Sequence, residues 1–291
     1  MTRAGAFILA FAGLALMACG GRGDPNPPPT PVIAAQDASA PRAPFVPHAV
    51  LPSPAASDYA PSAASVRDHT RLPPDGLVAI ERCEVCHADV FAQWSSSAHR
   101  FSSLDNPFYL PAFEAAREAR GAETTRWCGG CHDPALLFAG DLDGTRIDRT
   151  HERARLGVGC LLCHSVDHVH DRTGNGNYAL TTERVVYPPR EGEDHDAVEQ
   201  HKRRLLTDTM RSAEFCAACH KVGITEAING WRWLRGQNDF DPWDQSAWAG
   251  NDAERYDPDV PRRTCQDCHM PLEPATRGDR AATDGMVRSH R

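Results

Sequence analysis

Apolar residues concentrate at the N-terminus of this 291-residue chain and are scattered further along. Residues 4–18 form a run of apolar and small side chains, and Arg3 places a positive charge just ahead of it. The run is shorter than the roughly 20 residues that a membrane-spanning helix requires. Because a positive start and a short apolar run are typical of an export signal, we expect residues 1–18 to be a signal peptide.

Residues 19–75 are dominated by proline, alanine and serine. Such a segment buries too little apolar surface to fold by itself. Proline-rich segments are extended, with a rise of about 3 Å per residue. We therefore expect residues 19–75 to be a flexible tether and residues 76–291 to form the folded domain.

Helical patterns dominate the predicted domain. Residues 111–121 begin with proline and end with glycine, which predicts a short helix. Residues 196–221 predict a longer helical run, and residues 89–100 have helical character. Three segments rich in glycine, proline and aspartate predict loops: 171–178, 188–196 and 255–263. No segment indicates a convincing sheet, so we expect a mainly α fold with extensive irregular loops.

Cysteine and histidine recur together along the domain. Ten of the eleven cysteines form five Cys-x-x-Cys pairs, and a histidine follows each pair directly. The five motifs are Cys83/Cys86/His87, Cys128/Cys131/His132, Cys160/Cys163/His164, Cys216/Cys219/His220 and Cys265/Cys268/His269. With 14 histidines in the chain, chance would produce five such coincidences roughly once in several million sequences. The pattern is therefore a repeated motif.

Cys-x-x-Cys-His is the attachment signature of c-type haem. Each thiol forms a thioether to one vinyl group of the porphyrin, and the histidine binds the iron as an axial ligand. We expect five covalently attached haems, with the ten cysteines binding the porphyrins and the five histidines binding the irons. Because the domain has few residues for each haem, we also expect the chain to wrap around a stacked haem core.

Cysteine pairs also occur in three other kinds of site. Zinc ribbons combine two Cys-x-x-Cys pairs in one site, but five pairs do not divide into twos. Thioredoxin-like dithiols require a βαβ setting and normally one pair. A disulfide framework is compatible with an exported chain. None of the three explains why a histidine follows every second cysteine, so haem attachment is favoured.

Each iron needs a second axial ligand or keeps an open face. The candidates for this position are His99, His151, His168, His170, His201 and His290. His201 lies on a predicted helix, which is a rigid support for a ligand. His168 and His170 follow His164 too closely to bind the same iron, so either one would bind the iron of a neighbouring haem.

The eleventh cysteine, Cys19, follows the end of the predicted signal peptide. The string Leu16-Met17-Ala18-Cys19 resembles a bacterial lipoprotein box, in which the cysteine is lipidated and becomes the first residue. The resemblance implies a lipoprotein anchored at Cys19 to the outer membrane, facing the periplasm or the cell exterior. The alternative is an ordinary signal peptide that is cleaved near Ala18.

The sequence around the motifs carries a family resemblance. The strings CHADVFAQWSSSAHR, GVGCLLCHSV, FCAACHKVG, WRWLRGQNDFD and CQDCHMPLEP resemble cytochrome c family proteins of the hydroxylamine oxidoreductase and nitrite reductase superfamily. In that group a histidine in the context W-x-x-S-x-H is commonly a distal ligand, which implies this role for His99. The pentahaem nitrite reductases of the group carry lysine in place of one proximal histidine, whereas all five motifs here end in histidine.

These features favour electron transfer between redox partners through mostly bis-histidine haems. The alternatives are a reductase or oxidase of a small nitrogen or sulfur compound with one open haem iron, and a structural haem protein. The net charge of −8 disfavours nucleic acid and suits basic surfaces on other cytochromes or membrane electron-transfer complexes. Arg232 and Arg235 are candidates for pairing with haem propionates.

Overall fold

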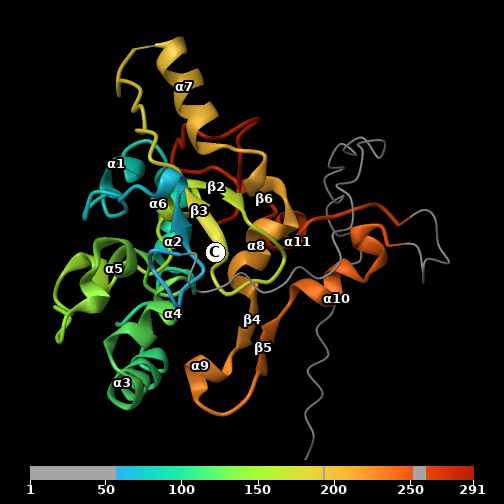
Figure 1. The fold of residues 1–291 in the computed structure, drawn as a ribbon. Helices are drawn as coiled ribbons and strands as arrows, with labels where there is room; N and C mark the ends of the chain where they lie inside the picture. The colour runs from blue at the N-terminus through green and yellow to red at the C-terminus, as the bar shows by residue number, and fades with distance from the viewer. Residues whose placement is uncertain (1–56, 193, 252–259) are drawn as a thin grey trace, which may run out of the picture. The chain divides into compact units, whose positions relative to one another are not determined.

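Short helices carry most of the regular structure in this computed structural model, which describes residues 57–192, 194–251 and 260–291 (Figure 1). The α-helices are α1 (Glu81–Glu84), α2 (Ala88–Ser95), α3 (Tyr109–Arg120), α4 (Arg126–Gly129), α5 (Pro134–Ala139), α6 (Cys160–Cys163), α7 (His195–Leu205), α8 (Ala213–His220), α9 (Glu226–Asn229), α10 (Phe240–Asp244) and α11 (Cys265–His269). The predominance of helices and loops confirms the expected fold class, and α3 confirms the helix predicted over residues 111–121.

Three small sheets complete the described part of the fold, although the sequence indicated none. Their strands are β1 (Ser65–Val66), β2 (Val166–Val169), β3 (Tyr178–Leu180), β4 (Lys221–Ile224), β5 (Leu234–Asn238), β6 (Leu272–Pro274) and β7 (Met286–Arg288). The first sheet has the order β1-β3-β2, and the other two are the antiparallel pairs β4-β5 and β6-β7. Strands of two to five residues are too short for apolar alternation to reveal them.

The folded domain begins earlier than the predicted boundary at residue 76. Val66 in β1 pairs with Leu180 in the parallel register of β3, and both side chains are buried. The ring of Tyr59 packs edge-on against that of Phe138, with centroids 4.7 Å apart. Residues 57–75 therefore pack against the domain, because Tyr59 and Val66 bury apolar surface that the proline-rich composition conceals. The predicted signal peptide, Cys19 and residues 19–56 lie outside the described residues.

The long helical run predicted over residues 196–221 is two helices. Helix α7 ends at Leu205, and the next residue, Leu206, leaves the helical region of backbone conformation. Helix α8 starts afresh at Ala213, where the hydroxyl of Ser212 caps it by accepting a hydrogen bond from the N–H of Phe215. The break sets α7, which carries His201, apart from the fourth Cys-x-x-Cys-His motif on α8.

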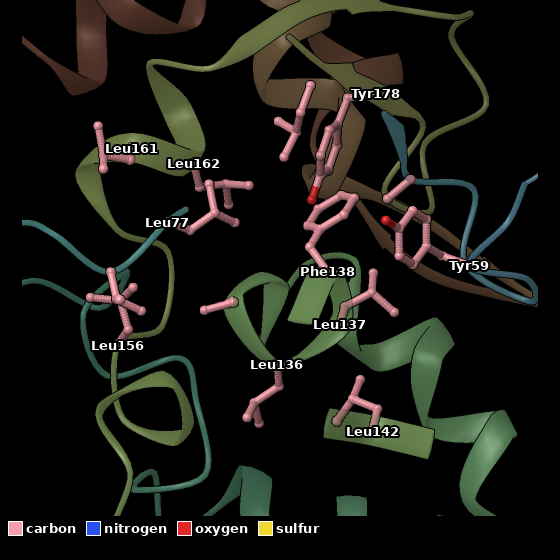
Figure 2. Close-up of a cluster of buried hydrophobic side chains, with 14 of the residues drawn as sticks. Tyr59, Leu77, Leu136, Leu137, Phe138, Leu142, Leu156, Leu161, Leu162 and Tyr178 are labelled. Carbon is pink, nitrogen blue, oxygen red and sulfur yellow. The ribbon is translucent and has the colours of Figure 1, made fainter. Parts of the chain in front are cut away.

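A cluster of buried apolar side chains surrounds α5 and β3 (Figure 2). Leu136, Leu137 and Leu142 are each at most 2% exposed, and full burial of such a side chain contributes about 1.5–3 kcal/mol. Leu161 and Leu162, which stand between the cysteines of the third motif, belong to the same cluster. The described part of the domain thus has an apolar core of protein side chains, which holds the third motif directly.

The second motif is fixed to this core through its two glycines. A Cβ atom at Gly129 would lie 2.5 Å from the side chain of Leu142, and one at Gly130 would collide with the hydroxyl of Ser62. The hydroxyl of Tyr178 donates to the carbonyl of Gly130 at 2.8 Å. Glycine is therefore required between the cysteines here, because the backbone of the motif lies directly against buried side chains.

Candidate haem-attachment and axial-ligand sites

Each of the five Cys-x-x-Cys-His motifs lies on a turn of helix. The motifs belong to α1, α4, α6, α8 and α11 and the residues directly following them. In the first motif the N–H of His87 donates to the carbonyl of Cys83 at 2.8 Å. The equivalent bond is 3.0 Å long in the second and third motifs. One helical turn therefore brings the two cysteines and the histidine of a motif together, which is the local geometry that haem attachment requires.

Thiols from different motifs lie next to one another. The pairs within hydrogen-bonding reach are Cys83 with Cys160, Cys131 with Cys219, and Cys216 with Cys265. Burial raises the pKa of Cys128 to about 11 and that of Cys163 to about 12, so both thiols are protonated at neutral pH. The contacts connect motifs that are far apart in the sequence, such as the first with the third and the fourth with the fifth.

The ten motif cysteines are free of disulfides in the described part of the chain. Within the same residues, no group of three or more histidine, cysteine, aspartate or glutamate side chains converges as it would around a closed metal site. A haem iron needs fewer protein ligands than a closed metal site, since the porphyrin supplies four ligands and the chain supplies only the axial ones. Free thiol pairs followed by histidines fit that need.

Six of the candidate ligand histidines donate a hydrogen bond from Nδ1 to an acceptor. The acceptors are Asp279 for His87, the Ser102 carbonyl for His132, the Leu205 carbonyl for His164, Asp167 for His168, the Val186 carbonyl for His201 and the Arg288 carbonyl for His290. An acceptor on Nδ1 fixes the proton there and leaves the Nε2 lone pair for a metal. No hydrogen bond in the described part of the chain engages Nε2 of these rings, so they fit iron ligation.

Two pairs of histidine rings stand at the separation expected across one iron. Two imidazoles on opposite sides of one metal have centroids about 6 Å apart, because each metal–nitrogen bond is about 2 Å. The centroids of His87 and His201 are 6.1 Å apart, with ring planes 13° from parallel. Those of His99 and His220 are 6.0 Å apart, with ring planes at 87°. Each pair joins a motif histidine to a histidine predicted as a second ligand.

His290 belongs to a group of histidines near His164, which also includes His87 and His201. Burial lowers the pKa of His164 to about 4, and it also lowers the pKa of His201 and His290. All three rings are therefore neutral at pH 7, and neutral imidazole is the form that binds iron. His290, at the end of the sequence, thus lies with the other candidate ligands.

The remaining predicted ligands have other contacts in the structure. Nδ1 of His151 accepts the N–H of Arg153 at 3.2 Å, so the ring proton stands on Nε2 and that nitrogen has no lone pair for iron. The rings of His168 and His170 meet edge-on, 4.8 Å apart, and His170 shares a hydrogen bond of 2.8 Å with the hydroxyl of Ser65. The described structure pairs none of these three rings with a motif histidine.

Buried carboxylates lie near the motif histidines, and the sequence did not indicate them. Asp133 accepts a hydrogen bond from the Tyr109 hydroxyl at 2.5 Å and another from Ser103, and burial raises its pKa to about 6. The ring of Tyr109 stacks on that of His132, with centroids 4.4 Å apart. Asp133 thus fixes a ring that supports His132. The position of Asp133 directly after His132 could have indicated this role. Nothing near Asp279 in the sequence indicates a partner for His87.

The two arginines proposed for propionate pairing lie on neighbouring tryptophans. The guanidinium of Arg232 stands 3.9 Å from the ring centre of Trp231, and that of Arg235 stands 4.8 Å from Trp233. Trp231 is 62% exposed. These four side chains form an exposed aromatic and basic patch at β5 and the residues just before it, and pairing with propionates stays a prediction.

Comparison with known proteins agrees with the motif geometry. The protein family described as cytochrome c554 and c-prime matches residues 82–165, which contain three of the five motifs. No curated protein sequence matches the chain. A penta-heme cytochrome c552 from Thermochromatium tepidum resembles it in structure, with 20% identity and a TM-score of 0.43. That match covers 75% of this chain and 57% of the other, so the chain spans little more than half of that cytochrome.

The family match and the repeated motifs together define the class. The chain is a multihaem c-type cytochrome, with haem attached covalently through its cysteine pairs. In the part of the chain that the structure describes, no helix has both the length and the apolar character to cross a bilayer.

Proposed function

We propose that the chain holds five haems and transfers single electrons between redox partners. The separation of two histidine pairs, His87 with His201 and His99 with His220, carries this proposal. A bound haem supplies a one-electron iron couple, and ligands on both faces leave no position for a substrate. At the irons of these two pairs no open face is left, which distinguishes them from the iron of a reductase.

The residues divide the work of holding the cofactors. The cysteine pairs would attach the porphyrins, and the five motif histidines would bind the irons. His201, His99 and His290 would supply second ligands to three of the irons, and their neutral state at pH 7 is supported by the lowered pKa of each ring. Histidine on both faces gives a lower potential than histidine with methionine.

Low-temperature EPR spectra of the purified, fully oxidised protein test this function. We expect mainly low-spin signals that added nitrite leaves unchanged, and a haem content of about five per chain by pyridine haemochrome assay. A high-spin signal of about one haem equivalent that shifts with nitrite would overturn the assignment to simple electron transfer. It would favour a reductase of a small nitrogen compound.

We further propose that the protein is exported and held at the outer membrane by a lipid on Cys19. The predicted signal peptide and the lipoprotein-like string before Cys19 support this localisation. A proline-rich segment between the anchor and residue 57 would let the haem domain reach partners at some distance from the membrane.

Replacement of Cys19 by alanine should release the cytochrome from the membrane fraction while its haem content and absorption spectrum stay unchanged. The physical reason is that the lipid on Cys19 would anchor the chain to the bilayer. The measurement is haem absorbance in the membrane and soluble fractions after cell lysis. If the C19A protein stays in the membrane fraction to the same extent as the wild type, the lipid anchor is wrong.

A further inference from the structure

Asp279 is a buried carboxylate directly behind the first motif histidine. Its side chain is 0% exposed, and its Oδ1 accepts a hydrogen bond from Nδ1 of His87 at 3.1 Å. The same oxygen accepts the N–H of Ala281 at 2.9 Å. Oδ2 accepts the N–H groups of Asp89 and Val90 at 3.2 and 3.1 Å. The carboxylate is thus fully hydrogen-bonded, as a buried charge must be.

The loop that carries this carboxylate, between β6 and β7, is anchored to the first motif. The carboxylate of Asp89, in α2, accepts the N–H and the hydroxyl of Thr276 at 2.9 and 3.0 Å and the N–H of Arg277 at 2.8 Å. The N–H of Arg280 donates to the carbonyl of Cys86 at 2.8 Å. These reciprocal bonds hold the loop, and so the negative charge, in a fixed place behind His87.

Three of the other motif histidines have weaker partners on Nδ1. His132 and His164 donate to neutral backbone carbonyls. Nδ1 of His220 lies 3.3 Å from the carboxylate of Asp239, whose side chain is 63% exposed, and 3.0 Å from the side-chain amide nitrogen of Gln237. Water screens an exposed charge, whereas a charge in a dry interior acts at close to full strength. Among the hydrogen bonds in the described structure, the one from His87 to Asp279 therefore carries the strongest electrostatic effect on a motif histidine.

A carboxylate behind a metal-bound imidazole makes that ligand more basic and more electron-donating. Greater donation stabilises the oxidised iron over the reduced iron, and second-shell hydrogen bonding is an established lever on haem potential. The inference rests on the proposed function, since it needs a haem at His87. We propose that Asp279 is a positioning residue that gives the first-motif haem the lowest reduction potential of the five.

Asp279→Asn is the direct test, because asparagine keeps the size of the side chain and removes its charge. Redox titration of the intact, haem-loaded protein is followed by the loss of low-spin EPR signals on reduction. In D279N we expect the lowest-potential component to shift upward and its g values to change, while the other components stay in place. Asp279→Glu restores the charge and should return that component toward the wild-type value.

Asp239→Asn is the matched control, because it removes the exposed carboxylate from His220. Its shift should be clearly smaller than that of D279N. An independent measurement needs no change at Asp279: replacement of His201 by alanine should remove the lowest-potential component, since that residue faces His87. If a different component disappears in His201→Ala, the assignment of the lowest potential to the first motif is wrong.

Haem content separates failure of this inference from failure of the proposed function. If wild type and D279N both carry about five haems and their titrations superimpose, Asp279 does not tune the potential and the electron-transfer function stands. Equal shifts in D279N and D239N, or in D279N and D279E, would also overturn the inference. If the wild-type protein carries no haem on Cys83 and Cys86, the proposed function itself fails at this motif.

Discussion

Replacement of His201 by alanine should convert one haem of the oxidised protein from low spin to high spin. His201 faces His87 at the separation of two axial ligands, so its loss leaves one iron with a single histidine. We expect a high-spin EPR signal of about one haem equivalent and a matching change in the absorption spectrum. Added imidazole should restore the low-spin state, which a merely structural role for His201 would not predict.

The same helix supplies a control for this substitution. His195 is the first residue of α7, six positions before His201, and its side chain is exposed. His195→Ala should leave every haem low spin, because the described structure places no motif histidine beside it. A low-spin spectrum in His201→Ala, with unchanged haem content and no response to imidazole, would show that a different residue binds this iron.

Replacement of Cys160 and Cys163 by serine should have the widest effect on the molecule. Serine forms no thioether, so the protein should lose about one-fifth of its haem, as measured by haemochrome assay and intact mass. The substitutions should also affect the first and fourth motifs, because Cys160 interacts with Cys83 of the first motif and Cys163 interacts with Cys219 of the fourth. We expect a lower temperature of thermal unfolding and altered low-spin signals from the remaining haems.

The fifth motif provides the comparison. Cys268 is exposed, and Cys265 interacts with Cys216 of the fourth motif. Cys265→Ser with Cys268→Ser should also remove one haem but should lower the unfolding temperature less. Equal losses of stability in the two double variants would contradict a central position for the third motif.

The sequence identified the features that are encoded locally. Each motif holds its chemistry within five residues, so cofactor type could be inferred without knowing the fold. The helix at α3 was predictable for the same reason, since its proline and its terminal glycine lie within the segment itself. His201 and His99 were named as second ligands; their ring centroids lie 6.1 and 6.0 Å from those of motif histidines, and ligation by them stays a prediction.

Features that depend on distant contacts were not predictable. The partner of His201 is His87, more than a hundred residues earlier, and no spacing rule connects them. Asp279 and His87 are 192 residues apart. Tyr59 and Val66 were assigned to the tether because the segment around them is rich in proline, alanine and serine. Composition does not show that these two apolar side chains are buried against the domain.

The closeness of thiols from different motifs has a consequence for how the cytochrome is made. Outside the cytoplasm, neighbouring thiols are readily oxidised to disulfides, and Cys83 with Cys160 or Cys216 with Cys265 would be joined across motifs. Such a crosslink would consume sulfurs that the porphyrins need. If the chain is exported as proposed, maturation must therefore keep it reduced and extended, and load each motif with its haem before the chain folds.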